Sequence, residues 1–249
     1  MNNKIIKKRI RTIRRKLIQK RIQALLVTNP ANVTYTTGFL GSDSWTLITD
    51  KTVYLLTDSR YTEQAKNQCP ACRIIERNKP MAETIAELAK KLKSIRTITI
   101  EKSSSLAVVE ALKKHVKLRI KTAANVIEPV RSIKDKTEIA AIRSAARIAA
   151  QILKQTFAYI KPGITENELA GRLDFQIRKA NAANSFETIV AFGPNASRPH
   201  HQPTSRKLKK NDTVLIDFGV KFKGYCCDIT RCFIIGRQNP FYQKAYAAV

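Results

Sequence analysis

The chain has 249 residues, 43% of them hydrophobic, so it is long enough for one or two globular domains with buried cores. Lysine and arginine number 46 against 19 acidic residues, which gives a formal net charge of +27. No apolar run approaches the roughly 20 residues of a membrane-spanning helix, and five scattered cysteines do not form a disulfide framework. We therefore expect a cytoplasmic globular protein.

The excess of positive charge has two interpretations. Nucleic acid, a ribosome or an acidic membrane surface would each attract such a chain. The basic residues are dispersed along the sequence, however, which favours a solvated lysine-rich surface.

The densest basic stretch is residues 1–21, with ten Lys or Arg and no acidic residue. Ile6, Ile10, Ile13 and Leu17 recur there at helical spacing, which predicts an amphipathic helix. We expect its apolar stripe to pack on the first domain. A targeting or membrane-surface role is the alternative.

Residues 22–128 alternate strand-like and helix-like patterns, which predicts an α/β domain. Two of the predicted strands form a hairpin around Asp50 and Lys51. The predicted strands cover residues 24–28, 46–50, 52–58 and 97–101, and the predicted helices cover residues 81–93 and 106–116. We expect a linker over residues 125–135.

Residues 129–249 follow a different pattern, with two long helices before a pair of strands. Asp135 with Glu138, and Thr165 with Glu168, have the spacing of capping boxes, so each pair predicts a helix start. The predicted apolar stripes are Ile139, Ile142, Ala146, Ala149 and Leu153 in the first helix and Leu169, Leu173 and Ile177 in the second. A strand is predicted over residues 185–192 and a loop over residues 193–204.

Two aspartates near the end of the chain point to a chemical site. Asp217 and Asp228 lie on two apolar runs joined by a short turn. A symmetric turn through residues 221–224 would set the two carboxylates directly opposite one another, with Cβ atoms about 4.5–5.5 Å apart, where like charges repel. A divalent cation between them would relieve that repulsion, and a pair of such ions about 3.5–4 Å apart is a known hydrolytic device. Two ligands do not hold two metals, so further ligands are needed.

Several segments, in chain order, together resemble the Xaa-Pro aminopeptidase and proline dipeptidase family. They are NVTYTTGF with TDSRY, VRSIKDKTEIAAIRSAARIA, FGPNASRPHHQPT and VLIDFGVKFKGYCCDITRCF. The resemblance covers nearly the whole chain after the N-terminal helix. It implies a creatinase-like α/β N-terminal domain followed by an α+β pita-bread catalytic domain. It also implies a metallopeptidase that cleaves before proline in peptides or dipeptides, and a homodimer.

The resemblance also implies roles for individual residues. Asp217 resembles the family's aspartate ligand to one metal, and Asp228 resembles the aspartate that bridges both. His200 resembles the loop histidine that contacts substrate, and an exchange of roles with the adjacent His201 stays open. The expected cofactors are two divalent ions, manganese, cobalt or zinc, without a choice among them.

The family's remaining ligands, one histidine and two glutamates, come from segments beyond the second aspartate. Residues 229–249 contain no histidine, aspartate or glutamate. We therefore expect the catalytic domain to be incomplete and the chain to be the N-terminal part of a longer protein. A second function stays open: a non-catalytic module of this fold that uses its charge to bind nucleic acid or ribosomes.

Overall fold

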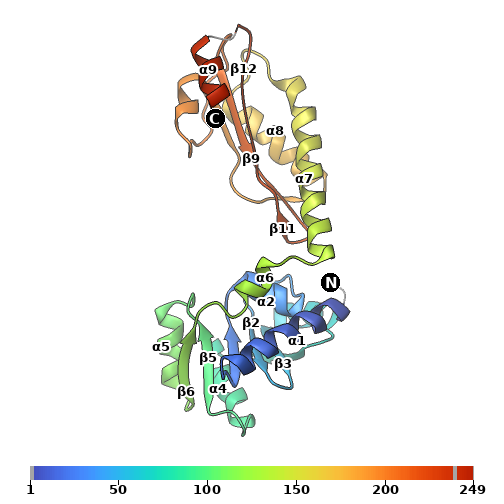
Figure 1. Cartoon of the computed structure of the whole chain (residues 1–249), viewed down its shortest axis with the longest axis vertical. Helices are drawn as coiled ribbons and strands as arrows, with labels where there is room; N and C mark the ends of the chain where they lie inside the picture. The colour runs from blue at the N-terminus through green and yellow to red at the C-terminus, as the bar shows by residue number, and fades with distance from the viewer. Residues whose placement is uncertain (1–2, 238–239, 249) are drawn as a thin grey trace. The chain divides into compact units, whose positions relative to one another are not determined.

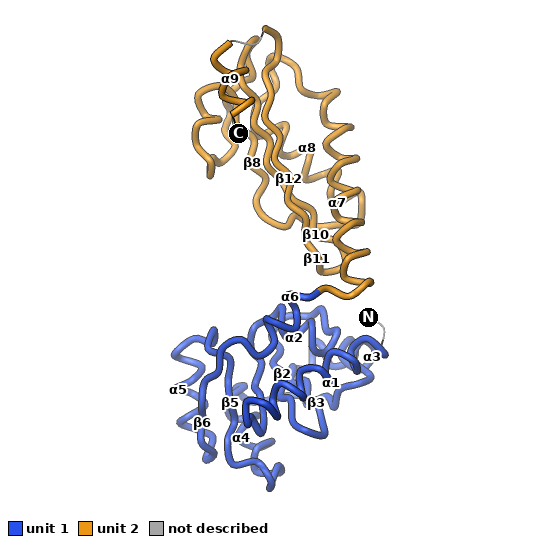
Figure 2. The backbone as a smooth tube through the Cα atoms, viewed as in Figure 1, with its two compact units in different colours: residues 1–133 blue, residues 134–249 orange. Residues whose placement is uncertain are grey.

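The computed structural model describes residues 3–237 and 240–248. The chain divides into two compact units, residues 1–133 and residues 134–249, drawn blue and orange in Figure 2. The segment expected to be a linker contains a short helix, α6 (Glu128–Ser132), which belongs to the first unit. Val126 and Ile127, just before it, are buried in that unit's core, so this part of the segment is packed rather than free.

The first unit is built on a six-stranded mixed sheet with the order β4-β3-β2-β1-β5-β6. Its central strand β1 pairs parallel with β5 and antiparallel with β2. The strands are β1 (Ala24–Val27), β2 (Trp45–Thr49), β3 (Val53–Asp58), β4 (Arg73–Arg77), β5 (Thr97–Glu101) and β6 (Arg119–Ala123). The four predicted strands and the hairpin are confirmed, whereas β4 and β6 were not predicted.

Helices cover both faces of this sheet (Figure 1). Alternate residues of β1 supply the two cores, because successive side chains of a strand point to opposite faces. Leu25 and Val27 pack in the cluster that includes α1, while Ala24 and Leu26 pack in the cluster that includes α4. The helices are α1 (Asn3–Gln19), α2 (Pro30–Thr37), α3 (Thr62–Gln68), α4 (Met81–Lys91) and α5 (Leu106–His115), with a 3-10 turn η1 at Ser59–Tyr61.

The N-terminal helix α1 packs on the first unit as predicted. Ile6, Ile10, Ile13 and Leu17 are all buried in the core cluster shared with β1 and β3. The apolar face of the helix is therefore occupied by its own unit. Among the described helices, none combines the length and apolar character needed to cross a membrane.

The second unit packs two helices, α7 (Lys136–Thr156) and α8 (Glu166–Lys179), against two small sheets. Both predicted capping boxes are present, at Asp135 with Glu138 and at Thr165 with Glu168. One sheet has the order β12-β9-β8, from β12 (Ile229–Ile234), β9 (Thr213–Phe218) and β8 (Ile189–Phe192). The other has the order β11-β10-β7, from β11 (Tyr225–Cys226), β10 (Val220–Phe222) and β7 (Ala183–Asn184). The remaining elements are η2 (Phe157–Tyr159), η3 (Gly193–Ser197) and α9 (Pro240–Ala248).

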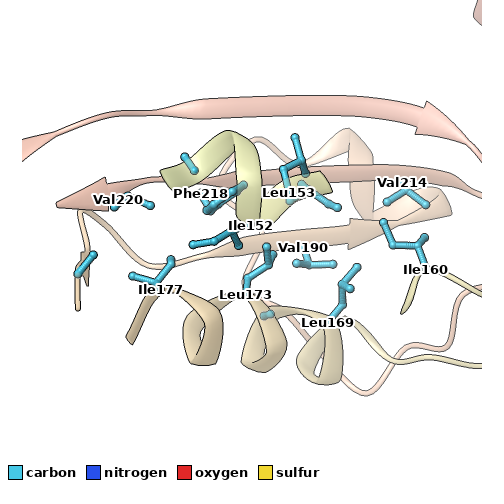
Figure 3. Packing of buried hydrophobic residues seen from close by; sticks show 14 of the residues in the cluster. Ile152, Leu153, Ile160, Leu169, Leu173, Ile177, Val190, Val214, Phe218 and Val220 are labelled. Atoms are coloured by element: carbon cyan, nitrogen blue, oxygen red, sulfur yellow. The ribbon is translucent and has the colours of Figure 1, made fainter. Parts of the chain in front are cut away.

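Figure 3 shows the core of this unit, where Leu169, Leu173 and Ile177 of α8 meet Val190 and Phe218. The predicted α8 stripe is confirmed, since all three of its residues are fully buried.

The predicted α7 stripe is only partly right. Ala149 and Leu153 are buried, but Ile139 is 38% exposed and Ala146 is also exposed, while Ala145 is buried instead. At the start of α7 the buried side chain is Glu138, whose Oε1 accepts a hydrogen bond of 2.9 Å from the Tyr225 hydroxyl. Ile139, the next residue along the helix, consequently lies on a different face.

The strand predicted over residues 185–192 is shorter than expected. Only Ile189–Phe192 forms β8. The start of the predicted segment is instead held by hydrogen bonds from Ser185 to residues outside this sheet. The Ser185 N–H donates to the Gly219 carbonyl, and the Ser185 hydroxyl donates to the Cys227 carbonyl at 3.0 Å.

Candidate metal centre

The turn that follows β10 decides how the two aspartates face each other. Phe222 pairs with Tyr225, so the turn consists of Lys223 and Gly224, whose φ angles are +50° and +84°. Two positive φ angles are the mark of a type I′ hairpin turn, whose twist matches that of the flanking strands. The predicted turn was centred one residue earlier and is wrong.

The observed register therefore sets Asp217 opposite Thr230 and not opposite Asp228. Continued toward the turn, the same register brings Asp228 level with Gly219. Asp217 and Asp228 are thus diagonal neighbours on one face of the hairpin, a relation with a typical separation of about 7–8 Å. Compared with direct opposition, the diagonal leaves more room for cations between the carboxylates.

Gly219 is required at this bend. A Cβ atom there would overlap the Ser185 hydroxyl and the Cys227 carbonyl oxygen. The ladder between β9 and β12 breaks beside it, since Cys227 and Asp228 lie between β11 and β12. Asp228 is consequently exposed, at a point where the hairpin passes from one small sheet to the other.

Asp217 lies on the face of β9 that points away from the core. Its neighbours Ile216 and Phe218 are fully buried against the helices, while Asp217 is half-buried. Its Oδ1 atom is inaccessible to solvent and has no hydrogen-bond partner within the described residues. Burying a carboxylate oxygen without a hydrogen-bond partner lowers the stability of the fold. We therefore interpret this atom as a candidate ligand to a bound cation.

Electrostatics connect the three predicted site residues. Burial raises the pKa of Asp217 above its usual value, a hydrogen bond with Thr230 opposes that rise, and the neighbouring Asp228 carboxylate adds to it. The charge of His200 acts to lower the same pKa. The structure therefore brings Asp217, Asp228 and His200 into one electrostatic neighbourhood.

The two adjacent histidines differ in environment. His200 is exposed, in the loop after η3. His201 is 6% exposed, and its Nε2 lies 2.9 Å from Oε2 of the fully buried Glu166. His201 is thus held inside the second unit, whereas His200 is the exposed histidine whose charge acts on Asp217.

Glu166 organises the loop that carries His200, and the sequence did not single it out. Its Oε1 accepts from the Phe192 N–H and the Asn195 amide, and its Oε2 accepts from the Thr204 N–H and hydroxyl. These bonds tie both ends of residues 192–204 to the start of α8. The only signal in the sequence was that Glu166 comes one residue after a helix N-cap. That signal is not specific, because acidic residues are common in the first turn of a helix for reasons unrelated to a loop.

The donor set fits divalent metal ions in part. Two carboxylates with an unsatisfied buried oxygen suit hard or borderline cations. No group of three or more His, Cys, Asp or Glu side chains that could hold a metal occurs among residues 3–237 and 240–248. Asp217 and Asp228 can therefore contribute to a metal centre but do not complete one.

Comparison with known proteins gives the family. Residues 9–133 match the creatinase/prolidase N-terminal domain, and residues 140–249 match metallopeptidase family M24. The chain belongs to the family of Xaa-Pro aminopeptidases and proline dipeptidases, in which such an N-terminal domain precedes an M24 domain. The predicted resemblance and fold class are confirmed.

Individual relatives agree with this assignment. The uncharacterized peptidase YqhT of Bacillus subtilis is 34% identical over 92% of this chain and 65% of its own length. An Xaa-Pro dipeptidase from Bacillus anthracis superposes with a TM-score of 0.92 at 29% identity, over 98% of this chain and 69% of its own. An X-Pro aminopeptidase from Thermotoga maritima gives a TM-score of 0.86 at 31% identity, over 96% of this chain and 68% of its own. The chain thus spans about two thirds of the length of these relatives.

Proposed function

We propose that this chain supplies part of the metal centre of an Xaa-Pro peptidase, which hydrolyses the peptide bond before proline. The observation that carries the proposal is the buried, unpartnered Oδ1 of Asp217 next to the Asp228 carboxylate, inside a chain of this family. A non-catalytic binding module would have no use for a buried carboxylate oxygen without a hydrogen-bond partner, because leaving that oxygen unpaired lowers the stability of the fold.

In the proposed centre, Asp217 would hold one divalent ion and Asp228 would serve as a ligand to both ions, with manganese, cobalt or zinc as the candidates. Such ions supply a hydroxide nucleophile at neutral pH and polarise the scissile carbonyl. The exposed His200, whose charge acts on Asp217, is assigned the contact with the substrate. Further ligands are needed besides these two carboxylates.

The substrate class follows from the chemistry of proline. The proline nitrogen carries no hydrogen and its ring fixes φ, so a peptidase that grips an extended chain through its N–H groups handles this bond poorly. A dedicated site for the ring is therefore expected. We propose proline-containing peptides or dipeptides as substrates and a homodimer as the assembly.

Metal binding by the present chain tests the carboxylate roles. We expect Asp217→Asn and Asp228→Asn each to weaken Mn²⁺ binding at least about 10–100-fold, the loss typical of disturbing even the supporting groups of a metal site. Isothermal titration at pH 7 measures this, with Asp50→Asn, an exposed aspartate of the first unit, as the control. Unchanged Mn²⁺ binding in both site variants would refute the assignment.

The proposed activity is tested by hydrolysis assays on the protein as it is isolated from its source cell. We expect release of proline from Ala-Pro, or of alanine from Ala-Pro-Ala, only with Mn²⁺ or Co²⁺ added, and the preferred substrate separates dipeptidase from aminopeptidase. Absence of hydrolysis with every metal, while Mn²⁺ still binds, would favour the non-catalytic module.

A further inference from the structure

A basic groove runs along the exposed side of α1 in the first unit. It has a volume of about 550 Å³ and lies between α1 and the turn that joins β2 to β3. Four exposed cations line it: Lys7, Arg11, Arg15 and Lys51. No part of the peptidase site described above involves these residues.

The cations are arranged in a row. Lys7, Arg11 and Arg15 are spaced by four residues, so they lie on one face of the helix. They span eight residues, which is about 12 Å at the helical rise. Lys51 comes from the hairpin turn on the other side of the groove.

These charges are available to a ligand. Within residues 3–237 and 240–248, none of the four side chains forms an ion pair. A fifth cation, Arg14, is fixed at the groove wall, where its Nε donates to the Thr49 carbonyl at 2.9 Å. Burial lowers the pKa of Arg14, and the negative charge of the neighbouring Asp50 opposes that effect. The groove thus combines one anchored guanidinium with four free cations.

We propose that this groove binds the phosphate backbone of a nucleic-acid strand. The three cations in a row of about 12 Å and Lys51 on the opposite wall offer four partners to the phosphates of one strand. No aromatic side chain lines the groove, among the described residues, so stacking on bases is absent and binding is independent of sequence.

An anionic membrane fits these observations less well. Binding of a helix to a lipid surface requires an apolar face that enters the bilayer. The apolar face of α1 is buried in the first unit, and the one large apolar side chain exposed on α1 is Ile18, at 76%. A concave basic groove with a buried apolar stripe favours a strand of phosphates over a bilayer.

The test measures binding of a fluorescein-labelled 12-nucleotide oligothymidylate to the full 249-residue chain by fluorescence anisotropy. Four phosphate contacts on a single strand predict a slope of about −2.8 in log affinity against log salt, or about 50-fold weaker binding at 200 mM than at 50 mM salt. Arg11→Gln/Arg15→Gln removes two contacts, so its slope should fall to about −1.4, a loss of about 7-fold over the same range.

A matched control separates the groove from the overall charge. Lys113→Gln/Lys114→Gln removes two exposed lysines from α5 and lowers the net charge equally. Its slope should equal that of the unmodified chain, and Lys51→Gln, on the other wall, should reduce the slope by about 0.7. Equal losses in the groove and control variants would overturn the proposal, because binding would then follow total charge.

Vesicles of anionic phospholipid provide the competing outcome. The chain should release bound oligonucleotide only weakly when such vesicles are added at equal phosphate concentration. Complete displacement by vesicles, with the same sensitivity to Arg11→Gln/Arg15→Gln, would overturn the proposal in favour of a membrane surface.

Discussion

Glu166 shows how one buried charge can hold a long loop in place. It is fully buried, and both of its oxygens accept hydrogen bonds from residues 192–204. Burial by itself would raise the pKa of Glu166, but the bonds from His201, Thr204, Asn195 and the Phe192 N–H outweigh it and lower the pKa to about 2. The carboxylate is therefore kept ionised as the anchor of the His200 loop.

Removing this anchor should destabilise the second unit strongly. We expect Glu166→Ala to lower the free energy of unfolding by about 3–5 kcal/mol, because several buried donors lose their acceptor at once. Glu187→Ala, at an exposed position, is the control and should change it by less than about 0.5 kcal/mol. Urea denaturation followed by circular dichroism measures both, and equal stability of the two variants would contradict the role given to Glu166.

The pKa of Glu166 also predicts a pH dependence. In the folded chain this pKa is about 2, below the ordinary value of 4.5. On acidification the unfolded chain therefore takes up the proton first, so the stabilisation is complete above about pH 4.5 and is lost as pH falls toward 2. The stability difference between the unmodified chain and Glu166→Gln should shrink between pH 5 and pH 3 in urea titrations. A difference that stays constant over this range would show that Glu166 does not titrate as expected.

At the scale of elements, the type I′ turn determines the register of the hairpin that carries both aspartates. Gly224 has φ +84°, and a Cβ placed there would contact nothing, so its only constraint is conformational. Gly171 also has open space around it, but it lies inside α8, where glycine is the weaker helix former.

The same substitution at these two glycines should therefore have opposite effects. We expect Gly224→Ala to destabilise the chain by about 1–2 kcal/mol, the cost of a left-handed residue with a side chain. Gly171→Ala should stabilise it by about 0.5–1 kcal/mol. Thermal and urea denaturation of the two variants show whether each substitution raises or lowers the free energy of unfolding. Stabilisation by both substitutions would mean that the turn at Gly224 is not a type I′ turn.

At the scale of the whole molecule, the two units have separate cores. The two clusters on either side of the first sheet draw only on residues 6–130, and the cluster of the second unit only on residues 145–235. Burial of apolar side chains, the main stabilising contribution, is thus completed within each unit.

The first unit should therefore fold without the second. We expect a fragment of residues 1–133 to unfold cooperatively in urea and to retain helical circular dichroism, because both faces of its sheet stay covered. A fragment of residues 24–133, which lacks α1, leaves Leu25 and Val27 under-covered and should be markedly less stable. Non-cooperative melting of the 1–133 fragment would show that its stability depends on the rest of the chain.

Two strands and a helix of the first unit, β4, β6 and α2, were not predicted from the sequence, for physical reasons. The edge strands β4 and β6 contain the runs RIIER and RIKTA, in which charged side chains protect the sheet edges. Those charges obscure the strand pattern in the sequence. The helix α2 has little amphipathic character and several β-branched residues, but tertiary packing buries it all the same.

The sequence by itself determined the family, the fold class and the capped helix starts, and it singled out the two aspartates as candidate metal ligands. These follow from local spacing and from motifs that lie within one segment. Tertiary structure alone decided that Asp217 faces Thr230, that His201 is buried on Glu166 and that Oδ1 of Asp217 lacks a partner. Each of these depends on backbone φ at a turn or on contacts between segments far apart in the chain, which no local pattern encodes.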